Sequence, residues 1–121
     1  MSRERELAVA LDAVRAAARL CETVRREMVG ESMEKKDRSP VTVADFGAQA
    51  LICRALQAEF PADPVVGEED AAELRTDEGA PILSKVAGYV SQEVPGATSD
   101  ETAGWIDHGN GKVSPRYWTL D

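Results

Sequence analysis

Aromatic residues are scarce in this 121-residue chain, and histidine is scarcer still. Phenylalanine, tyrosine and tryptophan make up 5% of the residues, and there is one histidine, His108. It lies in the stretch IDHGNG, which has the composition of a turn. Because no serine or cysteine nucleophile is an obvious partner for it, we interpret His108 as a surface residue rather than a catalytic base.

Basic residues are also in short supply. Lysine and arginine number 14 against 22 aspartates and glutamates, which gives a net charge of −8. A protein that follows a nucleic-acid backbone needs a basic surface, so this balance argues against nucleic-acid binding. It leaves room for a small phosphorylated molecule, since a divalent cation held by carboxylates can supply the positive charge.

Long apolar runs are missing from the sequence. The first residues, MSRERELAVALDAV, lack the character of a signal peptide, and no stretch has the length needed to span a bilayer. We therefore expect a cytoplasmic protein without a membrane partner. Cys21 and Cys53 each fall on the apolar side of a helical pattern, which favours two reduced, buried thiols over a disulfide.

The residues that are present predict a helix-rich single domain. A first amphipathic helix is expected from Glu4 to about Met28, with Gly30 as a stop signal and a polar loop over 31–40. Its apolar stripe has spacings of three and four residues: Leu7, Leu11, Val14, Ala18, Cys21, Val24 and Met28. A second helix is expected to run to about Phe60, with Thr42 as its N-cap and Asp45 in the capping-box position.

Beyond Phe60 the sequence predicts shorter elements. Residues 65–67 (VVG) are a short buried-strand candidate, and the acids that follow open a helical turn. A further helix carries Val86 and Val90, a short one is capped by Ser99, and 117–120 is a final strand. Helices with two short strands indicate an α/β or α+β fold, helix-rich with a partial sheet, like the opening portion of a layered α/β protein.

Acidic residues stand at the boundaries of these elements. Asp45 lies near a helix start, Glu68, Glu69 and Asp70 follow the first strand, and Asp121 follows the last. Hard cations such as Mg²⁺ need several oxygen ligands from different segments, and acids at such boundaries can converge. Simpler interpretations stay open: Asp45 as a capping-box acid, 68–70 as a first-turn acidic cluster, and Asp121 as merely the final residue.

Three motifs resemble a known family. The stretches KKDRSPVTVADFGAQALICRAL (35–56), FPADPVVGEED (60–70) and YWTLD (117–121) are similar to the start of the 3′(2′),5′-bisphosphate nucleotidases. These belong to the Mg²⁺-dependent, lithium-sensitive phosphatases that include inositol monophosphatase. The resemblance implies the first part of their layered α-β-α-β-α fold. In the family YWTLD runs into Pro-Ile-Asp-Gly-Thr, so residues 1–121 are expected to be one portion of a single phosphatase domain, cut within the metal-binding signature.

The resemblance also implies roles for individual residues. Glu68 matches a glutamate that binds catalytic Mg²⁺, and Asp121 matches an aspartate that bridges metals. Asp45 matches the acid that helps to position the attacking water, and Glu69 is expected beside the same site. The mobile loop over such sites corresponds here to Lys35 and its neighbours, to which no chemical role is assigned. No substrate-binding residue is predicted.

The implied activity is hydrolysis of adenosine 3′,5′-bisphosphate to AMP and phosphate with two or three Mg²⁺ ions, inhibited by Li⁺. The activity is expected of the longer protein, and the isolated chain is expected to be inactive because it lacks further metal ligands. Two alternatives stay open. One is an inositol-monophosphatase-like activity on inositol phosphates, and the other is a non-catalytic binding or assembly protein that associates through an open strand edge. The oligomeric state is not predicted.

Overall fold

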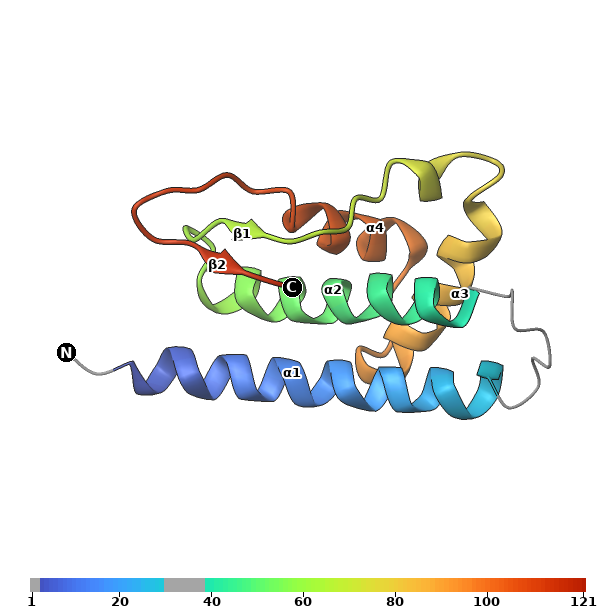
Figure 1. The fold of residues 1–121 in the computed structure, drawn as a ribbon, viewed down its shortest axis with the longest axis horizontal. Helices are drawn as coiled ribbons and strands as arrows, with labels where there is room; N and C mark the ends of the chain where they lie inside the picture. Colours follow the sequence, from blue (N-terminus) through green and yellow to red (C-terminus); the bar gives the residue numbers. More distant parts are fainter. Residues whose placement is uncertain (1–2, 30–38) are drawn as a thin grey trace.

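A computed structural model describes residues 3–29 and 39–121 of the chain. The predicted stop at Gly30, most of the loop 31–40 and Lys35 lie outside the described residues. Two long helices, α1 (Glu4–Val24) and α2 (Ser39–Glu59), lie side by side and run antiparallel (Figure 1). A short π-helical segment, Arg25–Val29, continues α1. The second helix, α2, contacts α1 and both of the shorter helices that follow, so that it is the central helix.

The contact between α1 and α2 corrects the predicted stripe. The residues of α1 that are buried are Ala13, Ala17, Leu20 and Val24, whereas Leu7, Leu11 and Val14 are 60%, 43% and 53% exposed. Small residues let the helix axes approach, and Leu20 lies directly against Gly47 of α2, where a Cβ would come 2.8 Å from its methyl groups. The stripe prediction was wrong at its first half because it followed side-chain size rather than closeness of packing.

The start of α2 also differs from the prediction. The helix begins at Ser39, with Pro40 in its first turn, where a missing N–H costs nothing. Thr42 therefore lies inside the helix, and its predicted role as N-cap was wrong. Asp45 is likewise a residue of the helix, with an exposed side chain, and so cannot be the acidic partner of a capping box at Thr42.

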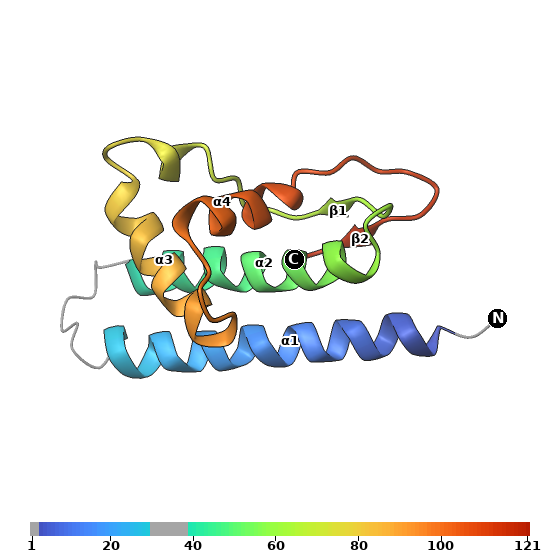
Figure 2. The ribbon, with the colours of Figure 1, turned by 180° about the vertical axis from the view of Figure 1, so that it is seen from behind.

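Two shorter helices, α3 (Ala80–Glu93) and α4 (Ser99–His108), complete the helical layer. The predicted cap of α4 is off by one residue: Thr98 is the N-cap, and its side chain and that of Glu101 form a capping box. In the segment before α3 the acids are followed only by a short 3₁₀ helix, Glu73–Arg75. Seen from behind, α3 crosses close to α1 while α4 lies along α2 (Figure 2).

The sheet consists of two short parallel strands, β1 (Val65–Val66) and β2 (Trp118–Thr119). Val65 is fully buried against Cys53 and Leu56 of α2, and Trp118 packs on the same cluster. The rings of Trp118 and Phe60 have their centroids 5.5 Å apart. These observations confirm the predicted fold class, a helix-rich α/β fold with a partial sheet.

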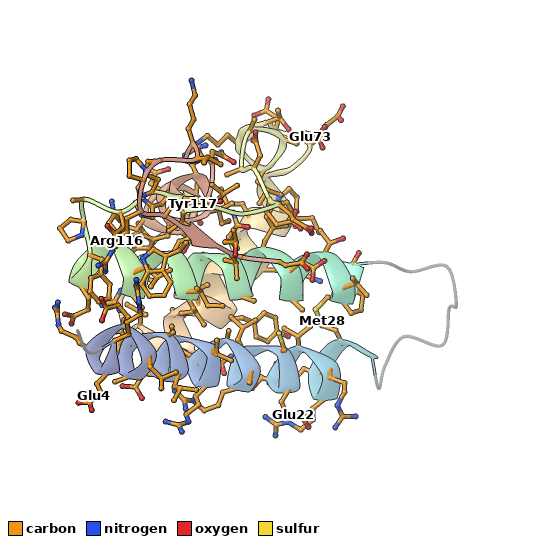
Figure 3. The ribbon with its side chains drawn as sticks, turned by 60° about the vertical axis from the view of Figure 1, so that its left-hand side comes forward. Glu4, Glu22, Met28, Glu73, Arg116 and Tyr117 are labelled. Atoms are coloured by element: carbon orange, nitrogen blue, oxygen red, sulfur yellow. The ribbon has the colours of Figure 1, made fainter. Side chains whose placement is uncertain are left out.

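The segment that carries β2 is anchored by Arg116. Its guanidinium donates to Asp63 at 2.7 Å and lies 3.1 Å from Glu6 of α1. The indole of Trp118 donates to the same Asp63 carboxylate at 3.2 Å. Figure 3 shows Arg116 and Tyr117 on the side of the molecule above the first turns of α1, while Glu4 and Glu22 project from the outer face of that helix.

Two further predictions concern single residues and membranes. Cys21 and Cys53 are free thiols, as predicted, but only Cys53 is buried, whereas Cys21 is half-buried. Burial raises the pKa of Cys53 to about 12. Among the described residues, no helix combines the length and the apolar character that crossing a bilayer requires.

Candidate metal centre

The two parallel strands bring two of the predicted acids to one edge of the sheet. Val65 pairs with Trp118 and Val66 with Thr119, and the N–H of Leu120 donates to the carbonyl of Val66 at 2.9 Å. Glu68 stands two residues after β1 and Asp121 two residues after β2. Because carboxyl ends of parallel strands share an edge, which is where α/β proteins place ligands, the fold itself juxtaposes these carboxylates.

A pocket of about 120 Å³ lies at this edge. All four predicted site residues line it, together with one amide and two apolar side chains: Asp45, Ala48, Gln49, Glu68, Glu69, Leu120 and Asp121. Asp45 comes from α2, the two glutamates from the segment after β1 and Asp121 from the segment after β2. The structure thus gathers acids from three separate segments, as the sequence predicted, while their chemical roles stay predictions.

The carboxylates in the pocket oppose one another's ionisation. The hydrogen bond that protonated Glu68 donates to the Asp121 carboxylate raises the pKa of Glu68, and so does the negative charge of Asp121; burial, Glu69 and Asp45 add to the effect. Burial and then the charge of Asp45 raise the pKa of Glu69. Like charges at close range favour the protonated form of a carboxyl, and a cation in the pocket would offset this repulsion.

The donor set of this pocket fits a hard divalent cation. Glu68 and Asp121 already approach each other closely enough to share a proton, and carboxylate oxygens from different segments are the ligands that Mg²⁺ takes. Within residues 3–29 and 39–121 no three side chains of His, Cys, Asp or Glu are arranged as a ready-made cage. Glu68 and Asp121 would therefore hold the ion, with Asp45 and Glu69 close by and water completing the coordination.

The segment after β1 is fixed by residues that the sequence did not single out. The N–H of Gly67 donates to the carbonyl of Gly109 at 2.6 Å, and the N–H of Ala71 donates to the carboxylate of Asp107 at 2.9 Å. Asp107 also pairs with Arg75. Burial alone would raise the pKa of Asp107, but hydrogen bonds from Ala71, Arg75 and Asn110 outweigh it and lower that pKa. Nothing in the sequence pattern reveals these contacts, because Asp107 lies 36 residues from Ala71.

His108 ends α4 and is not among the residues that line the pocket. Burial lowers the pKa of its imidazole, and its Nε2 is buried without a hydrogen-bond partner in the part of the chain that the structure describes. His108 is therefore a half-buried residue at the end of a helix, whereas the sequence predicted a surface residue in a turn. Because His108 does not line the pocket, the candidate chemistry of the site rests on its carboxylates.

The raised pKa of Glu68 has a measurable consequence for stability. Because the folded state holds this proton more tightly than the unfolded chain does, the stabilisation is complete below the ordinary value of 4.5 and is lost as the pH rises through the raised pKa. We expect the metal-free Glu68→Gln variant to unfold at a higher temperature than the wild type near neutral pH. The difference should shrink as the pH falls toward 4.5, which thermal unfolding across a pH series will measure.

The titration of Asp107 does not interfere with this measurement between pH 4.5 and neutral pH. Its pKa is lowered in the folded state, so its contribution to stability is present above its ordinary value of 3.8 and is lost only as the pH falls below that. If the wild type and Glu68→Gln unfold at the same temperature near neutral pH, the carboxyls of Glu68 and Asp121 do not interact.

Comparison of the sequence with known protein families identifies the class of protein to which this fold and its acidic edge belong. The family model described as the inositol monophosphatase family matches residues 2–105. The chain belongs to the inositol monophosphatase family, as its sequence motifs predicted.

Within the family, the chain is similar to several curated 3′(2′),5′-bisphosphate nucleotidases. The chain is 38% identical over its whole length to a 3′(2′),5′-bisphosphate nucleotidase of Schizosaccharomyces pombe and 35% identical to 3′(2′),5′-bisphosphate nucleotidase 1 of Arabidopsis thaliana. It is 37% identical to a 3′(2′),5′-bisphosphate nucleotidase of Emericella nidulans. The chain spans 38% of the length of each of these three relatives.

Proposed function

We propose that this chain contributes the acidic half of the active site of a Mg²⁺-dependent 3′(2′),5′-bisphosphate nucleotidase. The observation that carries the proposal is the meeting of Glu68 and Asp121 at the carboxyl edge of two parallel strands. Relatives that are 35–38% identical over the whole chain bear the name of this activity. The proposed reaction is hydrolysis of adenosine 3′,5′-bisphosphate to AMP and phosphate.

The residues divide the work by position. Glu68 and Asp121 would hold the cation, whose positive charge would favour the ionised form of both carboxyls. When bound, Mg²⁺ supplies a nucleophilic water near neutral pH and stabilises the negative charge of the phosphoryl group. Asp45 reaches the same pocket from α2 and accepts a hydrogen bond from the water that attacks phosphorus. Glu69, partly buried beside it, adds negative charge that favours cation binding.

The substrate class follows from charge. The chain has a net charge of −8, and the pocket is lined by four carboxylates, so a phosphate group approaches this edge only when cations offset the repulsion. A doubly phosphorylated nucleotide gains more from such cations than a monophosphate does. The names of the relatives favour the nucleotide over an inositol phosphate, which is the alternative substrate.

We also propose that residues 1–121 alone do not catalyse this reaction. Two-metal hydrolysis needs about six oxygen ligands for each Mg²⁺, with several from the protein. The pocket at the sheet edge offers four carboxylates in the described part of the chain, and they include no preformed cage. The relatives, of which this chain spans 38%, are large enough to supply additional ligands and a surface for the nucleotide base.

A chimera tests the proposal. The chain replaces the matching stretch of the S. pombe nucleotidase, and phosphate release is measured with adenosine 3′,5′-bisphosphate, inositol 1,4-bisphosphate and inositol monophosphate. We expect hydrolysis of the adenosine compound first, complete dependence on Mg²⁺, loss with EDTA and inhibition by Li⁺. The isolated chain is expected to release no phosphate.

The contrary outcomes are distinct. A folded chimera with no activity on any of the three substrates would contradict the proposed enzyme and favour a non-catalytic binding role. Faster hydrolysis of inositol phosphates would move the activity to the inositol branch of the family. Phosphate release by the isolated chain at the rate of the chimera would refute its proposed inactivity.

A further inference from the structure

Gln49 is a buried amide at the bottom of the acidic pocket. It lies on α2 with 4% of its surface exposed, and it lines the pocket beside Asp45 and Glu68. Its amide nitrogen donates to the carbonyl of Glu69 at 2.8 Å and to the carbonyl of Ile106 at 2.7 Å. Its amide oxygen accepts from the N–H of Glu69 at 3.1 Å. Both donors and the acceptor of the side chain are therefore used, as a buried amide requires.

The surrounding backbone is shaped to receive this amide. Gly67 and Gly109 pack against it: a Cβ at Gly67 would lie 2.6 Å from the amide oxygen, and one at Gly109 would come closer still to the amide nitrogen. The two glycines are themselves joined by the hydrogen bond from Gly67 N–H to the carbonyl of Gly109. Two absent side chains thus create the space in which Gln49 bridges α2, the segment after β1 and the end of α4.

The contact with Glu69 resembles that of a neighbouring strand. One side chain binds both the N–H and the carbonyl of the same residue, which fixes its backbone at two points. Glu68 stands between this doubly bound residue and Gly67, whose N–H is bound to Gly109. The backbone on each side of Glu68 is therefore held, although the Glu68 side chain itself is exposed.

We propose that Gln49 is a positioning residue for the metal-binding acids: by holding Glu69 at both backbone groups, it directs Glu68 toward Asp121. The inference rests on the proposed function, because it concerns the same metal site. It goes further in assigning the geometry of that site to a neutral side chain whose amide groups are all bound to the protein backbone. Partners behind the ligands commonly change metal affinity by roughly 10–100-fold.

Mn²⁺ binding by the 121-residue chain, followed by the electron paramagnetic resonance of the free ion, tests the proposal. Gln49→Leu removes all three hydrogen bonds at similar volume. Gln49→Glu keeps the acceptor for the Glu69 N–H but loses, when ionised, both donated bonds. We expect Mn²⁺ affinity to fall by roughly 10–100-fold in Gln49→Leu, and by less in Gln49→Glu, because the added carboxylate offsets part of the loss. The matched control is Val90→Ala, a fully buried residue of α3 outside the pocket, which should lower stability and leave Mn²⁺ affinity unchanged.

A measurement on the wild type covers the case in which the Gln49 variants do not fold. Hydrogen exchange of the Glu69 amide, read by NMR with and without Mg²⁺, reports the bond to Gln49 directly. We expect this amide to be protected in both states. Exchange at the rate of an open amide while Mg²⁺ is bound would overturn the positioning role.

The outcomes separate the two proposals. Folded Gln49 variants that bind Mn²⁺ as tightly as the wild type would overturn the role of Gln49 and leave the metal site intact. If Val90→Ala loses as much Mn²⁺ affinity as Gln49→Leu, the effect of Gln49 is that of any core residue, and its positioning role is overturned. Absence of Mn²⁺ binding by the wild type, both in the chain and in the chimera, would overturn the metal site and this inference with it.

Discussion

Replacing Glu68 with glutamine in the chimera is expected to lower phosphate release from adenosine 3′,5′-bisphosphate by more than about 100-fold, since even partners behind metal ligands cost up to that factor. Glutamine keeps the size of the side chain but removes the charge that binds the cation. The same change should abolish Mn²⁺ binding by the 121-residue chain. Initial rates at saturating Mg²⁺ and a Mn²⁺ titration provide the two measurements.

The control for Glu68 is Glu78→Gln, which makes the same change of charge at an exposed position before α3. It should leave rate and Mn²⁺ affinity as in the wild type. Because Glu68 is in repulsive contact with Asp121, Glu68→Gln is expected to stabilise the metal-free chain while destroying the metal site. A Glu68→Gln chimera that retains the wild-type rate would remove Glu68 from the proposed metal site.

The largest expected effect on stability is that of Leu20→Ala. Leu20 is 2% exposed and packs between α1 and α2 against Gly47, so its truncation leaves a cavity at the centre of the longest helix contact. We expect the free energy of unfolding to fall by about 2–5 kcal/mol. Typical domains have a total stability of about 5–15 kcal/mol, so the loss removes a large share of it. Urea denaturation followed by circular dichroism measures it.

Two companion variants define the cause of that loss. Leu7→Ala makes the same substitution on the same helix at a position that is 60% exposed, and should change the free energy of unfolding by less than about 0.5 kcal/mol. Gly47→Ala adds a methyl group toward the space that Leu20→Ala vacates, so the double variant should recover part of the lost stability. Equal losses for Leu7→Ala and Leu20→Ala would mean that the α1–α2 contact is not where the structure places it.

The sequence predicted where helices and strands occur better than it predicted which side of each helix is buried. The hydrophobic spacing located α1, and Val65, Val66 and the final aromatic residues located the strands. The buried face of α1 was missed because Ala13 and Ala17 contribute little to a hydrophobic pattern, although small residues are what bring two helices together. Thr42 was mistaken for a cap because the capping pattern is local, whereas the structure starts α2 at Ser39.

The candidate site divides in the same way. Acids that end strands could be predicted to converge, and Glu68 and Asp121 do lie together. Gln49 could not be found, because a single polar residue on an apolar helix face does not reveal its partners. Those partners are backbone groups 20 and 57 residues away. Residues that support a site from behind depend on tertiary contacts, and the sequence pattern carries no signal for them.

The pairing of β1 with β2 also sets the order in which the molecule can assemble. Asp63 lies just before β1 and accepts a hydrogen bond from Trp118 of β2, 55 residues away, and the chain between them contains α3 and α4. Closing so long a loop costs more entropy than forming contacts between residues that are close in the sequence. Non-local strand pairing is correspondingly slow. Glu68 and Asp121 therefore meet only when this loop has closed. A divalent ion held by both carboxylates would bind only the chain in which this loop is closed, and would therefore stabilise the folded state.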